Sequence, residues 1–218
     1  MKNHTIWHTL AKVCTLVICS VGFAPVQAAL IPTSDAIFGN NSITRDTTTG
    51  LEWLDITFSV NQSYNFVSTQ FASGGAFAGF RHATDNEVET LFINAGIPNI
   101  NRASVANIAP AIGLISLVGA TSFQSGNPEA IGITATVSRF GGGLRRAGLL
   151  DFFFSNGTGV YEASTNSLSY SESFGFDTVG HWLVRTTPVT SVPEPFTSYL
   201  VLSACASFGV LTARKKGT

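Results

Sequence analysis

The sequence predicts an α+β fold for the central part of the chain, residues 29–187. A pair of strands comes first, two helical patterns follow, and the remaining half consists of short β-rich stretches separated by Gly, Ser and Asn. Helices gathered in one part of a sequence favour an α+β domain over a doubly wound fold, in which helices and strands alternate. An all-β sandwich is the alternative.

The first two elements are expected to be strands at residues 43–45 and 51–55. Between them, residues 46–50 are polar and end in glycine, which is typical of a turn. The two strands therefore form a hairpin.

A short helix is expected next, in "NQSYNFVSTQFASGG". Tyr64, Val67 and Phe71 have the spacing of one helical face, behind a cap at Asn61 or Ser63. The double glycine at its end predicts that the helix stops there.

The segment "TDNEVETLFINAGIPN" carries the clearest local pattern in the chain. Thr84 and Glu87 have the spacing of a capping box, in which each side chain bonds the other's backbone at a helix start. An apolar stripe follows, and Gly96 and Pro98 end the helix. The stripe consists of Val88, Leu91, Phe92 and Ala95.

No further helix is expected. The segments "AIGLISLVG", "AIGITATVSR", "GLLDFFF", "GVYEAS", "LSYSESF" and "GHWLVRT" are short, rich in β-formers and bounded by turn residues, which predicts strands. Of residues 152–154, three consecutive phenylalanines, alternation along a strand leaves one or two outside the core.

Charge and cysteine content limit what the central part can do. Only 11% of the 218 residues are charged, and between residues 29 and 191 seven arginines face twelve acidic residues, a net charge of −5. Nucleic-acid binding is therefore not expected. All three cysteines lie in the end segments, so thiolate catalysis and thiolate zinc sites are excluded for the central part.

The N-terminal segment, residues 1–28, has the pattern of a secretory signal peptide. Lys2 and Lys12 flank a polar region, "VCTLVICSVGFA" supplies an apolar region of suitable length, and small residues precede Ala28. We expect cleavage after Ala28, following passage through the Sec machinery. An uncleaved N-terminal helix is the alternative, although the apolar run is shorter than the ~20 residues that span a bilayer.

The C-terminal segment, residues 188–218, has three parts in a fixed order. Val192, Pro193, Glu194 and Pro195 form a stiff, extended motif, residues 196–213 form a weakly apolar membrane segment, and Arg214, Lys215 and Lys216 form a basic stop. The basic stop predicts a cytoplasmic end and an exported body. A permanent single-pass anchor is the alternative to a removable tail.

Candidate chemistry in the central part is sparse. His82, Asp85 and Glu87 crowd one helix start, and His181 lies further along the chain, but no metal-ligand spacing is present. Capping and the helix dipole account for the two acids. The sequence predicts no catalytic residue, no metal site and no cofactor.

Two further motifs have structural interpretations. Residues 141–143 are three glycines, and without a P-loop pattern they predict a flexible turn beside two solvated arginines, Arg145 and Arg146. The triplet Asn127-Pro128-Glu129 is the reverse of the Glu-Pro-Asn calcium triplet of sugar-binding lectins and is interpreted as a coincidence.

The C-terminal segment resembles the PEP-CTERM sorting signal of Gram-negative bacteria, with Val192–Pro195 as its motif. The resemblance covers about the last tenth of the chain. It implies recognition by an exosortase, removal of the tail near the motif, and release or attachment at the cell surface. Such proteins are common in organisms that produce exopolysaccharide and form biofilms.

The central part resembles the Lcl-type C-terminal domain of bacterial exported proteins. The resemblance rests on "TTTGLEWLD", "GFRHATDNEVETL" and "HWLVR", with Phe80 where Trp is usual and His82-Ala83 in place of the common Leu-Pro. It implies a C-type-lectin-like fold, two helices against curled sheets. The matching residues are Gly50, Leu51, Trp53, Gly79, Phe80, Arg81, Thr84, Glu87, Val88 and Leu91.

The expected function is that of a non-catalytic, exported surface or matrix protein associated with exopolysaccharide. It passes the inner membrane, is held there by its tail, and ends at the cell surface or outside the cell. A secreted carbohydrate-active enzyme that uses Asp55, Asp85 or Glu87 is one alternative, because paired carboxylates catalyse glycoside hydrolysis. A calcium-dependent glycan-binding module is the other.

Overall fold

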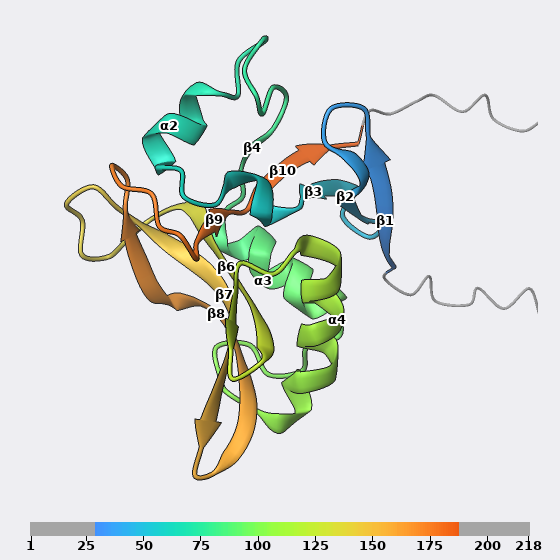
Figure 1. The fold of residues 1–218 in the computed structure, drawn as a ribbon, viewed down its shortest axis with the longest axis vertical. Helices are drawn as coiled ribbons and strands as arrows, with labels where there is room; N and C mark the ends of the chain where they lie inside the picture. The colour runs from blue at the N-terminus through green and yellow to red at the C-terminus, as the bar shows by residue number, and fades with distance from the viewer. Residues whose placement is uncertain (1–28, 188–218) are drawn as a thin grey trace, which may run out of the picture. The chain divides into compact units, whose positions relative to one another are not determined.

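A computed structural model describes residues 29–187, which contain helices and mostly antiparallel sheets (Figure 1). This agrees with the predicted α+β class, and the three α-helices exclude the all-β alternative. Ala28, Val192–Pro195, the membrane segment and the basic stop lie outside the described residues. The expected cleavage and sorting sites are therefore not part of the fold described here.

The first sheet has the order β1-β2-β3-β10-β4. The expected hairpin is present, because β2 pairs with β3 in antiparallel fashion and Thr44 faces Trp53. The strand β1, which begins directly after Ala29, was not predicted. The strands are β1 (Leu30–Asp35), β2 (Gly39–Asp46), β3 (Leu51–Leu54), β4 (Arg81–His82) and β10 (Leu183–Thr186).

The second sheet has the order β5-β6-β7-β8, with β9 parallel to β6. Three of its strands, β6, β7 and β8, were expected, except that the two segments expected from residue 159 onward form one long strand. The strand β5 was not predicted, and the expected strand "GHWLVRT" is divided between β9 in this sheet and β10 in the first. The strands of the second sheet are β5 (Ser122–Gln124), β6 (Asn127–Val137), β7 (Leu144–Ser155), β8 (Thr158–Ser171) and β9 (Gly180–His181). Of the three phenylalanines on β7, Phe152 is buried and Phe154 is exposed, although alternation places both on the same face and their rings lie 5.3 Å apart.

Both predicted helices are present. The helix α2 (Tyr64–Thr69) is capped by Ser63, whose Oγ accepts a bond from the Phe66 N–H, and it ends well before the double glycine. The helix α3 (Asp85–Asn94) has the full Thr84–Glu87 capping box, and Gly96 follows it with a φ of 81°.

The segment "AIGLISLVG" is helical, so the expectation of a strand was wrong. It lies in α4 (Ile108–Val118), which follows a short 3₁₀ helix, η2 (Val105–Asn107). Its buried residues have helical spacing, and they pack with α3 and the second sheet in the larger of two apolar clusters. These buried residues are Ala111, Leu114, Ile115 and Val118.

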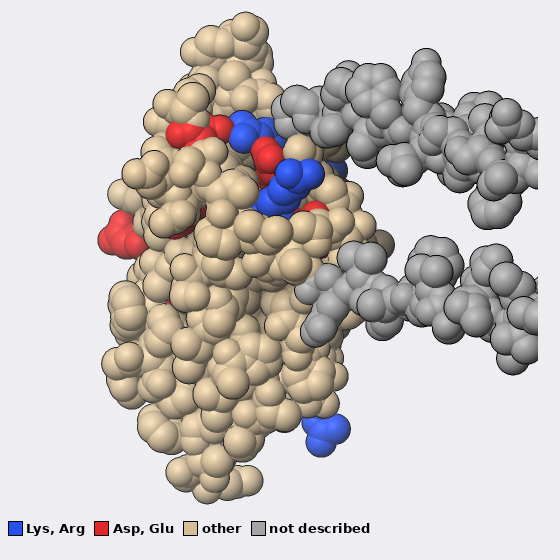
Figure 2. Space-filling model, turned by 90° about the vertical axis from the view of Figure 1, so that its right-hand side faces the viewer, with Lys and Arg blue, Asp and Glu red and all other residues tan. Residues whose placement is uncertain are grey.

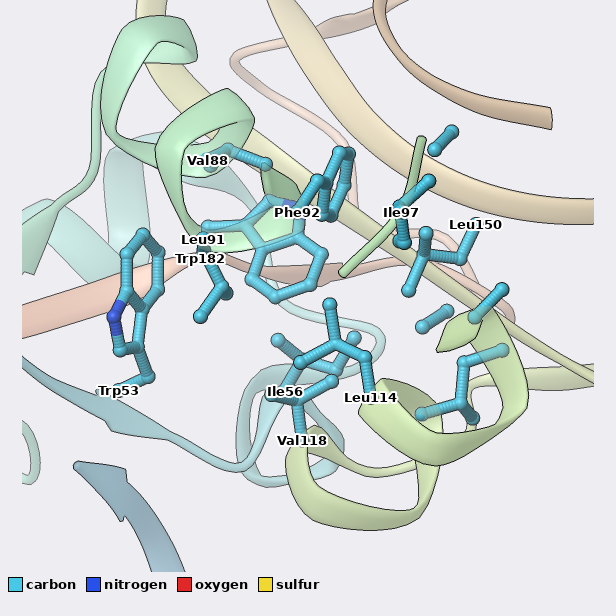
Figure 3. Packing of buried hydrophobic residues seen from close by; sticks show 14 of the residues in the cluster. Trp53, Ile56, Val88, Leu91, Phe92, Ile97, Leu114, Val118, Leu150 and Trp182 are labelled. Atoms are coloured by element: carbon cyan, nitrogen blue, oxygen red, sulfur yellow. The ribbon is translucent and has the colours of Figure 1, made fainter. Parts of the chain in front are cut away.

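Trp182 lies at the centre of the larger cluster, surrounded by Val88, Phe92 and Leu114 (Figure 3). Trp53 meets it edge-on, with ring centroids 6.0 Å apart. A smaller cluster, with Leu54, Val67 and Leu183, lies on the other side of the first sheet. Successive residues of β3 and β10 enter different clusters, because neighbouring side chains on a strand point to opposite faces.

Two glycines make room for the Trp182 indole. A Cβ atom on Gly148 would lie 2.6 Å from Val88 Cγ1 and 2.7 Å from Trp182 Nε1, and one on Gly132 would lie 2.8 Å from Trp182 Cδ1. The indole Nε1–H donates to the Gly148 carbonyl at 2.9 Å. The tryptophan therefore requires glycine on both strands beneath it.

We expect Gly148→Ala to lower the free energy of unfolding by about 2 kcal/mol, because the added methyl group overpacks the core. Urea unfolding of residues 29–187 measures the loss. Gly113→Ala is the control, since nothing lies within 4 Å of its added Cβ in α4 and alanine favours the helix. Equal stability of Gly148→Ala and the parent would contradict the conclusion that the Trp182 indole requires glycine at this position.

Candidate polysaccharide-binding groove

Two adjoining cavities lie where the start of α3 meets β6, β7 and β8, and we call them together the Arg146 groove. The basic cavity has a volume of about 290 Å³ and the acidic cavity about 380 Å³, near the lower end for small-ligand sites. The basic cavity is lined by Ser138, Arg139, Phe140, Leu144, Arg146, Asn166, Ser167, Leu168 and Ser169. The acidic cavity is lined by Thr84, Asp85, Asn86, Glu89, Thr136, Arg146, Thr165 and Asn166.

Arg146 lies between the two cavities and lines both of them. Its Nη1 donates to Asp85 Oδ2 at 3.3 Å, while Asp85 Oδ1 accepts a bond of 2.6 Å from the Thr134 hydroxyl. The expectation of two solvated arginines was wrong. Arg145 and Arg146 are both partly buried, and Arg145 Nε bonds Glu172 Oε1 at 2.7 Å.

The basic cavity contains two arginines and no acidic residue. At its mouth the Arg139 guanidinium lies 4.9 Å from the Phe140 ring centroid, and 71% of Phe140 is exposed. Within residues 29–187, Arg139 makes no ion pair. An exposed aromatic ring beside an unpaired cation offers an apolar face and a charge to the same ligand.

The acidic cavity carries Asp85 and Glu89 from one face of α3. Glu89 Oε1 accepts bonds from the Thr165 hydroxyl at 2.6 Å and the Asn101 amide at 3.2 Å. Asn86 and Asn166 are exposed beside it. This end of the groove is rich in hydroxyl, amide and carboxylate groups.

A second polar cluster is fully interior. His82 on β4 and His181 on β9 lie with Nε2 and Nδ1 3.0 Å apart, and His181 Nε2 lies 3.0 Å from the Gln62 carbonyl oxygen. A carbonyl only accepts, so His181 carries its proton on Nε2 and His82 donates to His181 Nδ1. Tyr64 stacks on His82 at 4.1 Å, which covers the pair.

Both histidines are held neutral. Burial lowers the pKa of His82 to about 3, and the charge of Arg145 and the charge that a protonated His181 would carry act in the same direction. Burial lowers the pKa of His181 to about 4, against the opposing effect of its bond to the Gln62 carbonyl. The pair has the features of a structural core element, and the sequence showed neither its burial nor its contact.

Three carboxylates form a row across the second sheet. Asp151 on β7 faces Glu162 on β8, and the β6–β7 register places Glu129 on its other side. Burial raises the pKa of Asp151 to about 7, assisted by a hydrogen bond and the charge of Glu129 and by the charge of Glu162. Such a row can share a proton, but neither cavity of the Arg146 groove is lined by it.

The carboxylates that sequence reasoning considered for catalysis have structural partners. Asp55 caps the 3₁₀ helix η1 (Ile56–Ser59) through the Thr57 N–H, and Glu87 bonds Arg81 and Thr84. Asp85 belongs to the groove. The reversed triplet is also engaged locally, because Asn127 donates to the Gln124 carbonyl and Glu129 accepts from Ser122.

Across residues 29–187 no group of three His, Cys, Asp or Glu side chains is arranged to hold a metal ion. No helix in the same part of the chain is both long and apolar enough to span a bilayer. Charged side chains are few on the face shown in Figure 2, where most of the surface is uncharged. Comparisons with protein-family models, curated proteins and solved structures gave no match to this chain.

We expect His82→Gln to reduce the pH dependence of stability between pH 5 and 6. The pKa of His82 is about 3 in the folded state and 6.5 in the unfolded state. The folded protein therefore has its full stability from this residue above pH 6.5 and loses it as the pH falls toward 3, because the unfolded state binds the proton first. The slope of unfolding free energy against pH should therefore decrease by about one proton, or ~1.4 kcal/mol per pH unit.

Urea unfolding of residues 29–187 over a pH series measures this slope. Asp151 acts in the opposite sense, since its raised pKa makes the folded state hold the extra proton, so the difference between parent and variant is the quantity to compare. Asp177→Asn, at an exposed position, is the control. An unchanged slope in His82→Gln would contradict a neutral His82.

Proposed function

We propose that this chain is an exported, non-catalytic surface or matrix protein whose body binds extracellular polysaccharide in the Arg146 groove. The observation that carries the proposal is the groove itself, an extended polar surface with an exposed aromatic ring at one end. Sugars present hydroxyl groups together with apolar ring faces, and both kinds of partner are available there. No nucleic acid is expected as a ligand of so acidic a body.

The sorting proposal rests on the end segments. A signal peptide ending at Ala28, the motif Val192–Pro195, an apolar segment and a basic stop occur in the order of an exosortase substrate. The chain then passes the inner membrane by the Sec machinery and is held there by its tail. Processing delivers the body to the cell surface or the surrounding biofilm matrix of a Gram-negative organism.

A C-type-lectin-like body is part of the same proposal. The residues that carry the resemblance act together in one unit: Arg81 bonds Glu87, Thr84 caps α3, and the following apolar residues are buried. Trp53 of the same pattern lies in the larger core cluster. A sequence pattern whose members contact one another supports a shared local structure.

A non-catalytic role is supported by the engagement of the carboxylates. Asp55 and Glu87 serve as caps, and Asp85 is bonded to Thr134 and Arg146. Each therefore has a structural partner. A glycosidase needs two carboxylates that face a common substrate pocket. Asp85 and Glu89 both line the acidic cavity, but Glu89 is also engaged, because it accepts hydrogen bonds from Thr165 and Asn101.

We expect the tail to be removed in cells that contain an exosortase, and to be retained when Glu194 and both flanking prolines are replaced by alanine. Mass spectrometry of the mature parent protein and of the mature variant identifies the C-terminal residue of each. Replacement of Thr186 and Thr187, outside the motif, is the control. A parent protein that still carries residues 196–218 at the cell surface would contradict the sorting proposal.

We expect Phe140→Ala to weaken binding of the host's exopolysaccharide by about 5-fold, because packing of a sugar's apolar face on an exposed aromatic ring contributes on the order of 1 kcal/mol. Phe123→Ala is a closely matched control, since Phe123 is 70% exposed and lies on β5. Sedimentation of the protein with the polysaccharide measures binding. Equal affinities of the two variants for the polysaccharide would contradict the assignment of polysaccharide binding to the Arg146 groove.

A further inference from the structure

We infer that the Arg146 groove selects a polysaccharide in which a uronate is followed by a neutral sugar. The basic cavity takes the uronate and the acidic cavity takes the neutral residue. This inference rests on the proposed function and deepens it, because it names the charge pattern of the ligand.

The basic cavity fits a carboxylate. Arg139 and Arg146 line it with no acidic residue, and Arg139 has no ion pair in the described part of the chain. Arg146 uses a single one of its five donors on Asp85. A carboxylate placed between them receives charge-assisted hydrogen bonds, which are stronger than those between neutral groups.

The loop between Phe140 and Leu144 joins two residues that line the basic cavity, although its three glycines do not line the cavity themselves. Gly141, Gly142 and Gly143 have φ values of 63°, 68° and 70°, so all three are left-handed, which glycine tolerates best. Within residues 29–187, the N–H groups of Gly142 and Gly143 have no hydrogen-bond partner. Successive free N–H groups favour an anion, while the Phe140 ring offers a surface for the sugar's apolar face.

The acidic cavity disfavours a second carboxylate. Asp85 and Glu89 line it together with Arg146, which offsets the charge of Asp85, so Glu89 carries the negative charge that has no cation partner there. Like charges repel most strongly where solvent is partly excluded. The same oxygens accept hydrogen bonds from sugar hydroxyls, and the exposed amides of Asn86 and Asn166 add donors and acceptors. A polymer of uronates alone therefore meets repulsion at this end, and a wholly neutral polymer leaves Arg139 unpaired.

Glu172 lies near the loop, with Oε2 3.9 Å from the Cβ position of Gly143. Its other carboxylate oxygen bonds Arg145, which faces Tyr64 and does not line the groove. The charge of Glu172 is thus offset by an arginine other than the two in the basic cavity. The groove keeps one positive end and one negative end.

The test uses the full chain in a detergent without a sugar headgroup and three oligosaccharides of equal length. Hyaluronan fragments alternate uronate and neutral residues, alginate fragments are uronate throughout, and cello-oligosaccharides are neutral. Calorimetry should show hyaluronan fragments binding at least about 10-fold more tightly than the other two, the effect of one added charge-assisted contact.

Arg139→Gln should remove most of this preference by weakening hyaluronan binding about 10-fold, with little change for the neutral fragments. Arg45→Gln is the matched control, because Arg45 is exposed on β2 of the other sheet and also makes no ion pair among the described residues. Both variants change the net charge equally. A larger loss of hyaluronan affinity in Arg139→Gln than in Arg45→Gln therefore reflects the position of Arg139 and not the change in total charge.

Alginate or cello-oligosaccharide binding as tight as hyaluronan binding would overturn the charge pattern and leave the proposed function standing. Preference retained in Arg139→Gln would overturn the assignment of the uronate to the basic cavity. Failure of all three probes and of the host's exopolysaccharide to bind would overturn the proposed function together with the inference.

Discussion

The passage of the chain from the second sheet to the first at Trp182 is the constraint on which the rest of the structure depends. Its N–H donates to the Ile133 carbonyl of β6 at 3.0 Å, and its carbonyl accepts from Ala83 at 2.8 Å, next to β4. The indole fills the slot above Gly132 and Gly148 and contacts Phe92 edge-on. One residue thus fixes the separation of both sheets and the position of α3.

The Arg146 groove depends on the same contact. Ala83 also accepts a 2.7 Å bond from the Ala135 N–H, so the residue before the α3 cap is tied to β6. Thr136 then accepts from the Asp85 N–H at 3.0 Å, and the first turn of α3 is held against the sheet. The acidic wall of the groove is therefore fixed to the same sheet as the core beneath it.

Local patterns were readable from the sequence, and contacts between distant segments were not. The α3 start is predictable because Thr84 and Glu87 act within one turn. The segment of α4 has a glycine at residue 113 and several β-branched residues, and its helical burial pattern has meaning only once α3 and the second sheet are packed against it. The expected solvated arginines failed for a similar reason, since Glu172 and Asp85 lie 27 and 61 residues from their partners.

The two sheets also differ in their connection to the ends of the body. The first described strand, β1, and the last, β10, belong to the same sheet, separated by β2 and β3. Tension applied between the two ends of the body passes through the hydrogen bonds of that sheet, which break in sequence or together according to their direction. The strands that line the groove, β6, β7 and β8, lie in the other sheet. A pull on the end strands therefore reaches them only through the Trp182 and Ala83 hydrogen bonds and not through the ladder between the end strands.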